Sequence, residues 1–512
     1  MAHSSERLTK AGDFNLDICE ILSYTISGGA PGSQQPFRVN IIPIIASIEL
    51  EEGIFQHTMS GKIQVFDTKD VRSVFPITGL EKLNLKFHTP GLSGICAVAN
   101  EGHPFRIYKI ETVAPNPKGI GAGNQAYDIY FCSRESYFNN FRKVSKAYDG
   151  PLELGVNDIF TNTKYLNSRK QLYIEPTRVP TKIVVPNLKP FAAIDMLARK
   201  AVSKKYNNAG YLFYETKEGY QFRSIESLLA VDGAIARPAK WNYFYGMQNV
   251  RNPHTDSKEI ITDMHQVSSW NLLNPVDILN NLNQGAYASK LIEHDMFNKT
   301  INTTEYDYDE DFYNHFHTEH SDGFRTAVKT PLPRARFEDT FKTLSESFDQ
   351  KVMLKSSTSA IHDNPEQQSI SDRHTTQKAM SQRQLLTNGI LEFTAPGNSL
   401  IQAGDIIKFD MPLMESGGHN KKPKSNPYWS GRYLIYSMKH MIDRGKGRYT
   451  IAVRAVKDNV AQAYTAEQNS WTHMAPKQAT HNLYDIDKEL LGRIETKGQL
   501  DGVKLPSRGP HR

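Results

Sequence analysis

The stretch "TAPGNSLIQAGDIIKFDMP", residues 394–412, contains two turns followed by a short apolar run. Asn398 and Gly404 mark the turns, because these residue types adopt the backbone conformations that tight turns require. The run "DIIKFDM" that follows has the length and composition of a strand. Its apolar residues alternate imperfectly, which is typical of a strand that meets protein on both faces. We therefore expect a compact β-unit here.

Neighbouring segments extend this unit. Strand-like runs of similar length, separated by turn residues, occur at 389–398, 431–443 and 448–458, and the insert at 413–430 is predicted to be an exposed loop. Together they predict a small antiparallel barrel or sheet over residues 386–460. A second set of strands, including the alternating runs "SGKIQVFD" and "LNLKFHTPG", predicts another antiparallel barrel or sandwich over roughly 13–135.

The middle of the chain has a different pattern. The segment "LKPFAAIDMLARKAVSK" places apolar residues on one helical stripe with Pro190 near its start, and "YLFYETKEGYQFRSI" reads as a β-hairpin. Another helix is predicted with Asn274 as its N-cap and Gly285 as its end. Residues 302–384, acidic and then rich in Ser, Thr and Gln, are expected to form a long surface connection with one helix near 336–348.

Composition limits the class of protein. A chain of 512 residues exceeds one hydrophobic core, and a net charge of +6 without a clustered basic face argues against nucleic acid as a partner. Three scattered cysteines, Cys19, Cys96 and Cys132, predict neither a disulfide framework nor a zinc site. The longest apolar run, at 41–48, is far too short for a membrane span, and residues 1–14 lack a signal sequence. We expect a protein of the cytosol, or one released by lysis.

A histidine cluster is the sharpest candidate for a metal site. His315, His317 and His320 lie within "FYNHFHTEH", where imidazoles two residues apart on a strand share a face. The alternative is a polar aromatic loop with solvated histidines, and this is the interpretation we adopt.

Other chemical motifs are weak or absent. The sequence has no HExxH, Gly-x-Ser-x-Gly, P-loop or paired CxxC motif, so we predict no catalytic, cofactor-binding or metal site. Four further features are interpreted without a chemical role. The carboxylate pairs Glu51/Glu52 and Asp309/Asp311 are expected to be solvated charges, the glycines at 119–123 a flexible hairpin tip, and the basic segment at 419–424 an exposed loop.

Several runs, taken in their order along the chain, resemble a known family. These runs are "SGKIQVFDTKDVRSVFPITGLEKLNLKFHTPG", the hairpin quoted above, "GAYASKLIEHD" and "GNSLIQAGDIIKFDMP…SGRYLIYSMKHMI". Together they resemble the central baseplate hub protein of T-even-like contractile-tailed bacteriophages. The resemblance covers most of residues 13–460.

The resemblance implies an α+β, predominantly β fold with two small antiparallel tube-type β-barrels and interleaved α+β material. It divides the chain into an N-terminal arm at 1–12, a first barrel at 13–135, an α+β region at 136–385 whose strands around 241–270 return to the first barrel, a second barrel at 386–460 and a C-terminal tail at 461–512. The second face of the strand at 405–411 would then meet a ring neighbour or the tail tube.

The resemblance also implies a structural role in the virion and no enzymatic activity. Three subunits would form a ring that adapts the six-fold tail tube to the three-fold central spike. Expected partners are further copies of the chain, the spike, the tube protein and its initiator, and baseplate wedge proteins. Two alternatives stay open, a spike-base component of another contractile injection system and a tail-associated cell-wall hydrolase. We expect the tail to become ordered only against the spike or a neighbouring subunit.

Overall fold

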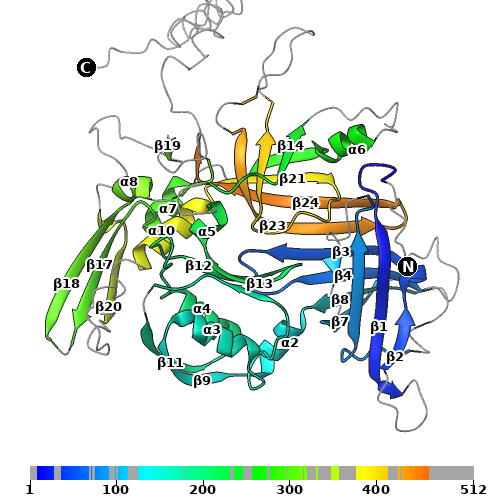
Figure 1. The fold of residues 1–512 in the computed structure, drawn as a ribbon, viewed down its shortest axis with the longest axis horizontal. Helices are drawn as coiled ribbons and strands as arrows, with labels where there is room; N and C mark the ends of the chain where they lie inside the picture. The colour runs from blue at the N-terminus through cyan, green and yellow to red at the C-terminus, as the bar shows by residue number, and fades with distance from the viewer. Residues whose placement is uncertain are drawn as a thin grey trace, which may run out of the picture. The chain divides into compact units, whose positions relative to one another are not determined.

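The computed structural model describes most of the chain up to residue 460. The described ranges are 8–27, 36–67, 71, 75–91, 98–99, 102–113, 125–178, 180–230, 236–245, 257–273, 277–296, 298–314, 316–319, 330–331, 348–356, 376–412, 425–426 and 429–460. Strands dominate and helices lie between them in the sequence, which confirms the α+β, predominantly β class (Figure 1). The arm residues 1–7, the tail and residues 336–347 of the predicted helix near 336–348 lie outside the described residues.

The largest sheet has fifteen strands and draws on both ends of the chain. Its amino-terminal strands are β1 (Asn15–Ser27), β2 (Pro36–Asn40), β3 (Ile45–Gly53), β4 (Ser60–Asp67), β5 (Lys82–His88), β6 (Val98–Ala99), β7 (Phe105–Val113) and β8 (Gln125–Cys132); the 3-10 turn η1 (Ile42–Ile44) lies between β2 and β3. The others are β14 (Trp241–Tyr245), β15 (Gln266–Val267), β16 (Ser269–Leu273), β21 (Gly389–Pro396), β22 (Ile406–Asp410), β23 (Gly431–Asp443) and β24 (Arg448–Lys457).

The two sets of strands are joined by β3 and β23, which pair antiparallel from Ser47 opposite Asp443 to Gly53 opposite Ser437. On that same edge of β23, β22 pairs with residues 431–434, while β24 occupies the other edge. The prediction of two barrels needs correction, because none of the described sheets closes into a barrel. The reason is that β23 extends beyond β22, and the rest of the same edge pairs with β3. That edge joins the amino-terminal and carboxy-terminal strands and is not available to close either set into a barrel.

The strands near 241–270 also differ from the prediction. They were expected to return to the first barrel, but β14 pairs with β22 and β16 pairs with β21. Aromatic packing accounts for this placement, since Tyr243 lies 5.0 Å from Phe393 and Trp270 lies 6.4 Å from Phe409 between ring centroids.

The strand β22, from the stretch that opened the sequence analysis, is covered on both faces at its start. Ile407 and Phe409 enter the main core, while Ile406 packs in a second cluster with Leu212 and Tyr214 of the middle region. The chain's own α+β region therefore supplies the second cover that was assigned to a neighbour or the tube. Lys408 is exposed.

The middle region folds as an α+β layer beside this sheet. Its elements are α2 (Arg134–Phe141), β9 (Val144–Gly150), α3 (Leu152–Thr161), β10 (Leu172–Ile174), β11 (Thr181–Leu188), α4 (Pro190–Ala198), β12 (Tyr211–Thr216), β13 (Gly219–Ser224) and α5 (Ile225–Leu229). The predicted helix beginning at Pro190 is confirmed as α4, and the hairpin is confirmed by the antiparallel pairing of β12 and β13. The buried stripe of α4 packs with the hairpin in one apolar cluster.

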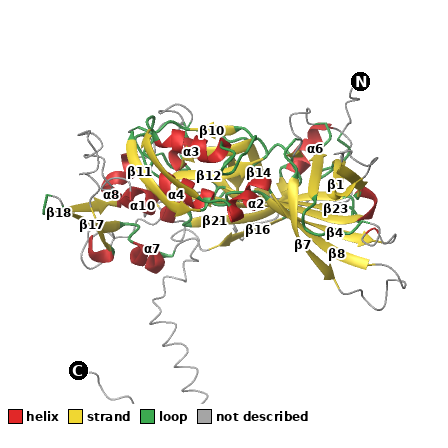
Figure 2. Cartoon of the chain, turned by 90° about the horizontal axis from the view of Figure 1, so that it is seen from below, coloured by secondary structure: helices red, strands yellow, loops and turns green. Residues whose placement is uncertain are grey.

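A smaller three-stranded sheet follows. The remaining elements are α6 (Ser257–Met264), α7 (Ile278–Gln284), β17 (Ala288–Asp295), β18 (Thr300–Asp307), α8 (Tyr308–Asp311), η3 (Phe312–Asn314), β19 (Thr330–Pro331), η6 (Phe348–Gln350), β20 (Val352–Ser356), α10 (Thr376–Leu386) and β25 (Asn459–Val460). Figure 2 shows β17 and β18 beside α8 and α10.

Two predictions about this region need correction. The expected surface connection at 302–384 contains most of strand β18 and all of β20, which both pair with β17, together with helix α8 and most of α10, so its described part contributes to a sheet and its flanking helices. Helix α7 is capped by Asp277, whose side chain accepts a hydrogen bond from the Asn280 N–H, and not by Asn274. Gly285 ends the helix as predicted, with a left-handed φ of 68° that glycine adopts without strain.

Candidate functional site

Eight strands of the large sheet form one continuous antiparallel surface, in the order β16, β21, β24, β23, β3, β4, β8 and β7. Side chains alternate along each strand, so one face enters the core and the other carries polar groups. The polar face includes Ser269, Asn271, Glu392, Thr394, Arg454, Ser437, Lys439, Glu49, Glu51, Lys62, Gln64, Asp128, Tyr130, Lys109 and Glu111. We call this surface the polar face.

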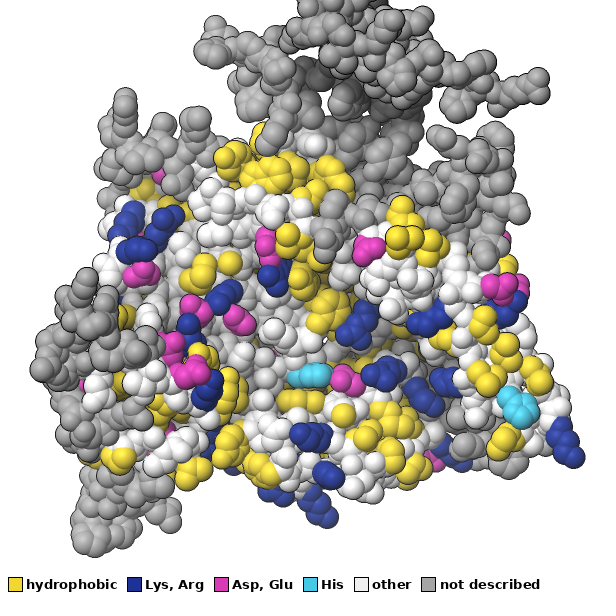
Figure 3. All heavy atoms as spheres, turned by 180° about the vertical axis from the view of Figure 1, so that it is seen from behind, with side chains coloured by type: hydrophobic (Ala, Val, Ile, Leu, Met, Phe, Trp, Pro, Cys, Tyr) yellow, Lys and Arg dark blue, Asp and Glu magenta, His cyan; other side chains and the backbone are white. Residues whose placement is uncertain are grey.

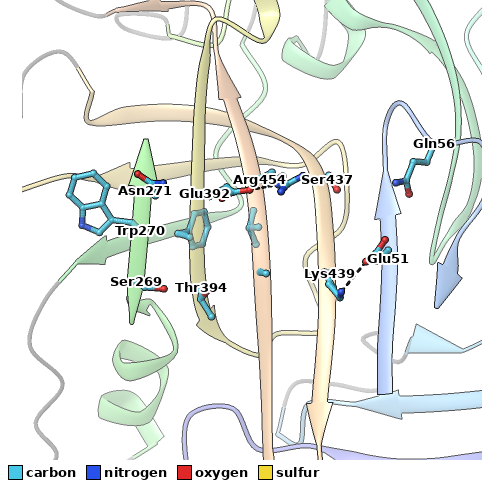
Figure 4. Close-up of a pocket in the computed structure, with 13 residues that line it drawn as sticks. Glu51, Gln56, Ser269, Trp270, Asn271, Glu392, Thr394, Ser437, Lys439 and Arg454 are labelled. Atoms are coloured by element: carbon cyan, nitrogen blue, oxygen red, sulfur yellow. Dashed lines mark hydrogen bonds and ion pairs between the residues drawn. The ribbon is translucent and has the colours of Figure 1, made fainter. Parts of the chain in front are cut away.

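A shallow groove of about 430 Å³ crosses five of these strands, from β16 to β3 (Figure 4). Arg454 forms an ion pair with Glu392 across β24 and β21, and Lys439 reaches Glu51 across β23 and β3. Figure 4 shows Trp270 projecting from β16 away from these charged side chains. The groove thus crosses the joint between the two halves of the sheet.

Charges on the polar face are paired with one another. The Lys439 ammonium lies 2.7 Å from Glu49 and 3.0 Å from Glu51, and Lys62 lies 3.8 Å from both Glu49 and Asp128. Partial burial disfavours the charge on Lys439, but hydrogen bonds to the two carboxylates outweigh it and raise its pKa. The positive and negative charges on this part of the surface therefore offset one another locally.

The same pattern continues to the edge strand β7. Glu111 accepts hydrogen bonds from Lys109 at 2.7 Å and from the Tyr130 hydroxyl at 2.8 Å. These bonds lower the pKa of Glu111, and the bond to Glu111 raises that of Tyr130 to about 12. At the other end of the sheet, the hydrogen bond to Glu392 raises the pKa of Arg454.

The two outer strands of this surface leave backbone edges open. Within the described residues, β16 pairs only with β21, and β7 pairs with β5 only at Phe105 and Arg106. Open edges of this kind are competent to pair with another chain.

The histidine cluster does not form a metal site around His317. Its Nδ1 lies 2.6 Å from an Asp458 carboxylate oxygen, and its Nε2 donates to the Phe312 carbonyl at 2.8 Å. Since both ring nitrogens are engaged, neither is available to a metal ion in this arrangement. His315 and His320 lie outside the described residues, and the part of the chain that is described holds no cluster of three or more potential ligands.

The structure also shows where the candidate carboxylate pairs lie. Glu51 and Glu52 point to opposite faces of β3: Glu51 lies on the polar face, whereas Glu52 is buried and accepts a hydrogen bond from the Ala403 N–H at 2.8 Å. Asp309 and Asp311 lie in α8, and Asp311 pairs with Lys378 at 2.8 Å. The structure does not bring either pair together as an acid and base. The loops at 119–123 and 419–424 lie outside the described residues.

Sequence reasoning missed a buried charged cluster between the first half-sheet, by which we mean strands β1 to β8, and the α+β region. Lys170 bridges Glu135, at 3.2 Å, and Glu215. Glu215 also accepts hydrogen bonds from the Met59 N–H at 2.8 Å and the Ser133 hydroxyl at 2.5 Å. Burial disfavours the charge on Lys170, but the two carboxylates outweigh it and raise its pKa. No local pattern distinguishes these residues from solvated ones.

Surface charge and hydropathy complete the description. Figure 3 shows Lys and Arg side chains interspersed with Asp and Glu over the described part of one face of the molecule. No helix among the described residues is long and apolar enough to cross a membrane.

Comparison with known proteins gives matches at the level of structure. No protein-family model and no curated protein matches the sequence. The structural neighbours include tail proteins and a type VI secretion system component. A tail protein from Neisseria meningitidis is 8% identical with a TM-score of 0.46, and the match covers 87% of this chain and 98% of that one.

Two other solved structures are similar. A 43 kDa tail protein of prophage MuSo2 from Shewanella oneidensis is 8% identical with a TM-score of 0.46, covering 86% of this chain and 98% of that one. A type VI secretion system component from E. coli, described as similar to tail proteins of bacteriophage T4, is 10% identical with a TM-score of 0.39, covering 82% and 75%.

Proposed function

We propose that this chain is a structural subunit of a contractile-tail baseplate hub, which forms a homotrimeric ring between a six-fold tail tube and a three-fold spike. The observation that carries the proposal is the eight-stranded polar face, which is assembled from both halves of the chain and open at its two edges. In the ring, each subunit would contribute two sheet units, so three subunits would present six.

The direction of the strands supports closure of such a ring. Each strand from β16 to β7 is antiparallel to the next, and the number of strands is even. The strand β16 of one copy would therefore meet β7 of the next copy in the antiparallel sense. The edges are offset along the strands, so ring closure would require the strands to be tilted and staggered, as closed sheets are.

The distribution of side chains supports the same arrangement. Ile110 on β7 and Trp270 and Leu272 on β16 are partly buried and pack against the main core. Joining these edges would continue the apolar layer on one side and the polar face on the other. The polar face would then line the channel of the ring.

In this proposal the chain has no lytic activity, and its partners are the spike, the tube and its initiator, and wedge proteins in the virion tail. Purified protein should leave a suspension of bacterial cell walls turbid. Clearing that is abolished by substitution of a single carboxylate or histidine would favour a tail-associated hydrolase.

The ring itself is tested by mass. Light scattering of the purified protein, alone or with the spike protein, should give three times the chain mass, and negatively stained particles should show a three-fold ring with six lobes. A protein that stays monomeric with and without the spike would contradict the proposal. Images of tail tips would distinguish a phage from another contractile injection system.

A further inference from the structure

Among the described residues, helix α10 contacts one face of the small sheet of β18, β17 and β20. On the covered face, Gln377 of α10 donates hydrogen bonds to the Ser289 carbonyl at 3.0 Å and hydroxyl at 3.1 Å, and to the Thr304 carbonyl at 3.4 Å. Leu291 on the same face is buried. Helix α10 therefore packs against this side of the sheet.

The opposite face carries large apolar side chains in solvent. Ile301 on β18 is 67% exposed, and Val352 and Leu354 on β20 are 51% and 79% exposed. Ile292 on β17 is only partly buried and pairs directly with Leu354 in the ladder. Isolated exposed apolar residues are ordinary, but a group on one face of one small sheet is characteristic of an interaction surface.

The two edge strands of this sheet are β18 and β20. Within the described residues, β18 and β20 each pair only with β17. Since β17 is antiparallel to β18 and parallel to β20, the two edge strands run in opposite directions. The edge of β18 in one copy can therefore pair antiparallel with the edge of β20 in another.

We propose that the occupant of this surface is a second copy of the chain: β18 of each subunit pairs with β20 of the next, and three copies close around their exposed apolar faces. This inference rests on the proposed trimer and adds to it a specific contact. Three copies of three strands make a closed sheet of nine strands. A barrel of about eight strands has an interior that side chains just fill, so apolar groups at this size form a packed core.

One register suits the side chains at the new edge. Placing Ile301 opposite Leu354 also places Thr303 opposite Val352, and it brings no like charges face to face. On the same face, Lys290 lies 3.4 Å from Glu305 within the subunit and opposite Val352, while His294 lies opposite Ile301, so polar side chains would flank the apolar group toward both ends of the closed sheet. The apolar residues would then be enclosed.

Cysteine cross-linking tests this contact. Ile301 and Leu354 both face solvent, so the double variant I301C/L354C should fold, and the two positions lie on opposite sides of β17, too far apart for a bond within one chain. Oxidation or a short bismaleimide should convert this variant into a covalent trimer on a denaturing gel. The single variants should not cross-link alone, and a mixture of the two should give covalent dimers. The unmodified protein controls for Cys19, Cys96 and Cys132.

The outcomes separate this inference from the proposed function. A trimer by light scattering that does not become covalent in I301C/L354C would overturn the contact and leave the ring intact. Dimers formed by I301C alone would show symmetric β18–β18 pairing and would also overturn it. A protein monomeric under all conditions would overturn both. As a second readout, Leu354→Asp should weaken the trimer, so that its mass in light scattering falls on dilution at a higher protein concentration than for the unmodified protein, whereas Leu279→Asp, at an exposed position on α7, should leave that concentration unchanged.

Discussion

Lys170 lies between the carboxylates of Glu135 and Glu215, and its side chain is only 9% exposed. Replacing it with methionine retains much of the packing but leaves two buried carboxylates without their cation. We expect Lys170→Met to lower the free energy of unfolding by about 3–5 kcal/mol, as measured by urea denaturation.

A matched control comes from an exposed ion pair. Lys146 lies 2.9 Å from Asp158 and is 45% exposed, so Lys146→Met should cost less than about 1 kcal/mol. Equal effects of the two substitutions would show that the buried cluster does not hold the α+β region to the first half-sheet.

Glu52 predicts a pH dependence of stability. Its burial raises its pKa from an ordinary value of 4.5 to about 8, so the folded protein binds a proton that the unfolded chain has lost in this interval. The stability that the folded protein gains from holding Glu52 protonated is fully present below pH 4.5 and is lost as the pH rises through 8. We therefore expect the free energy of unfolding of the unmodified protein, relative to Glu52→Gln, to fall between pH 5 and pH 8.

The comparison with Glu52→Gln is needed because His440 acts in the opposite direction. Burial lowers the pKa of His440 to about 3, which makes stability increase with pH from about 3 to 6.5. Glutamine can still accept the hydrogen bond from the Ala403 N–H, so the difference isolates the titration of Glu52. A difference that is constant from pH 5 to pH 8 would show that Glu52 is ionised in the folded protein.

At the scale of the element, Gly61 lets β4 lie close to the backbone of β3 and to the Phe131 side chain of β8. A Cβ atom at this position would overlap the Glu49 carbonyl and the ring of Phe131, which is fully buried. We expect Gly61→Ala to destabilise the protein by about 1–3 kcal/mol because rigid groups must shift. Thermal unfolding measures this, with Gly445→Ala, whose nearest neighbour atom would be 3.4 Å away, as a control that should change little.

Elements with a local signature could be predicted from the sequence. The alternation in "SGKIQVFD" predicted β4, and the apolar stripe after Pro190 predicted α4. The pairing of β3 with β23 has no such signature, because it depends on strands at opposite ends of the chain. Charged residues such as Lys170 and Glu52 look solvated in a sequence, since their burial is decided by tertiary packing.

At the scale of the whole molecule, the polar face could be anticipated only in parts. Alternation in each strand predicts that one face is polar, but not that eight strands from two halves share one surface. The predicted barrels would have closed the sheets within one subunit. The open edges of β16 and β7 instead leave any closure of this surface to contacts between subunits.

The charges of this surface predict how a ring would respond to salt. Lys439 pairs with Glu49 and Glu51, and Arg454 pairs with Glu392, all within one chain. Subunit contacts would therefore depend on backbone edges and apolar side chains, which salt screens little. We expect the trimer to keep its mass between about 0.1 M and 1 M NaCl, over which the screening length falls from about 10 Å to 3 Å. Urea, which weakens apolar burial, should dissociate it. Dissociation by salt alone would instead indicate that ion pairs between subunits hold the ring together.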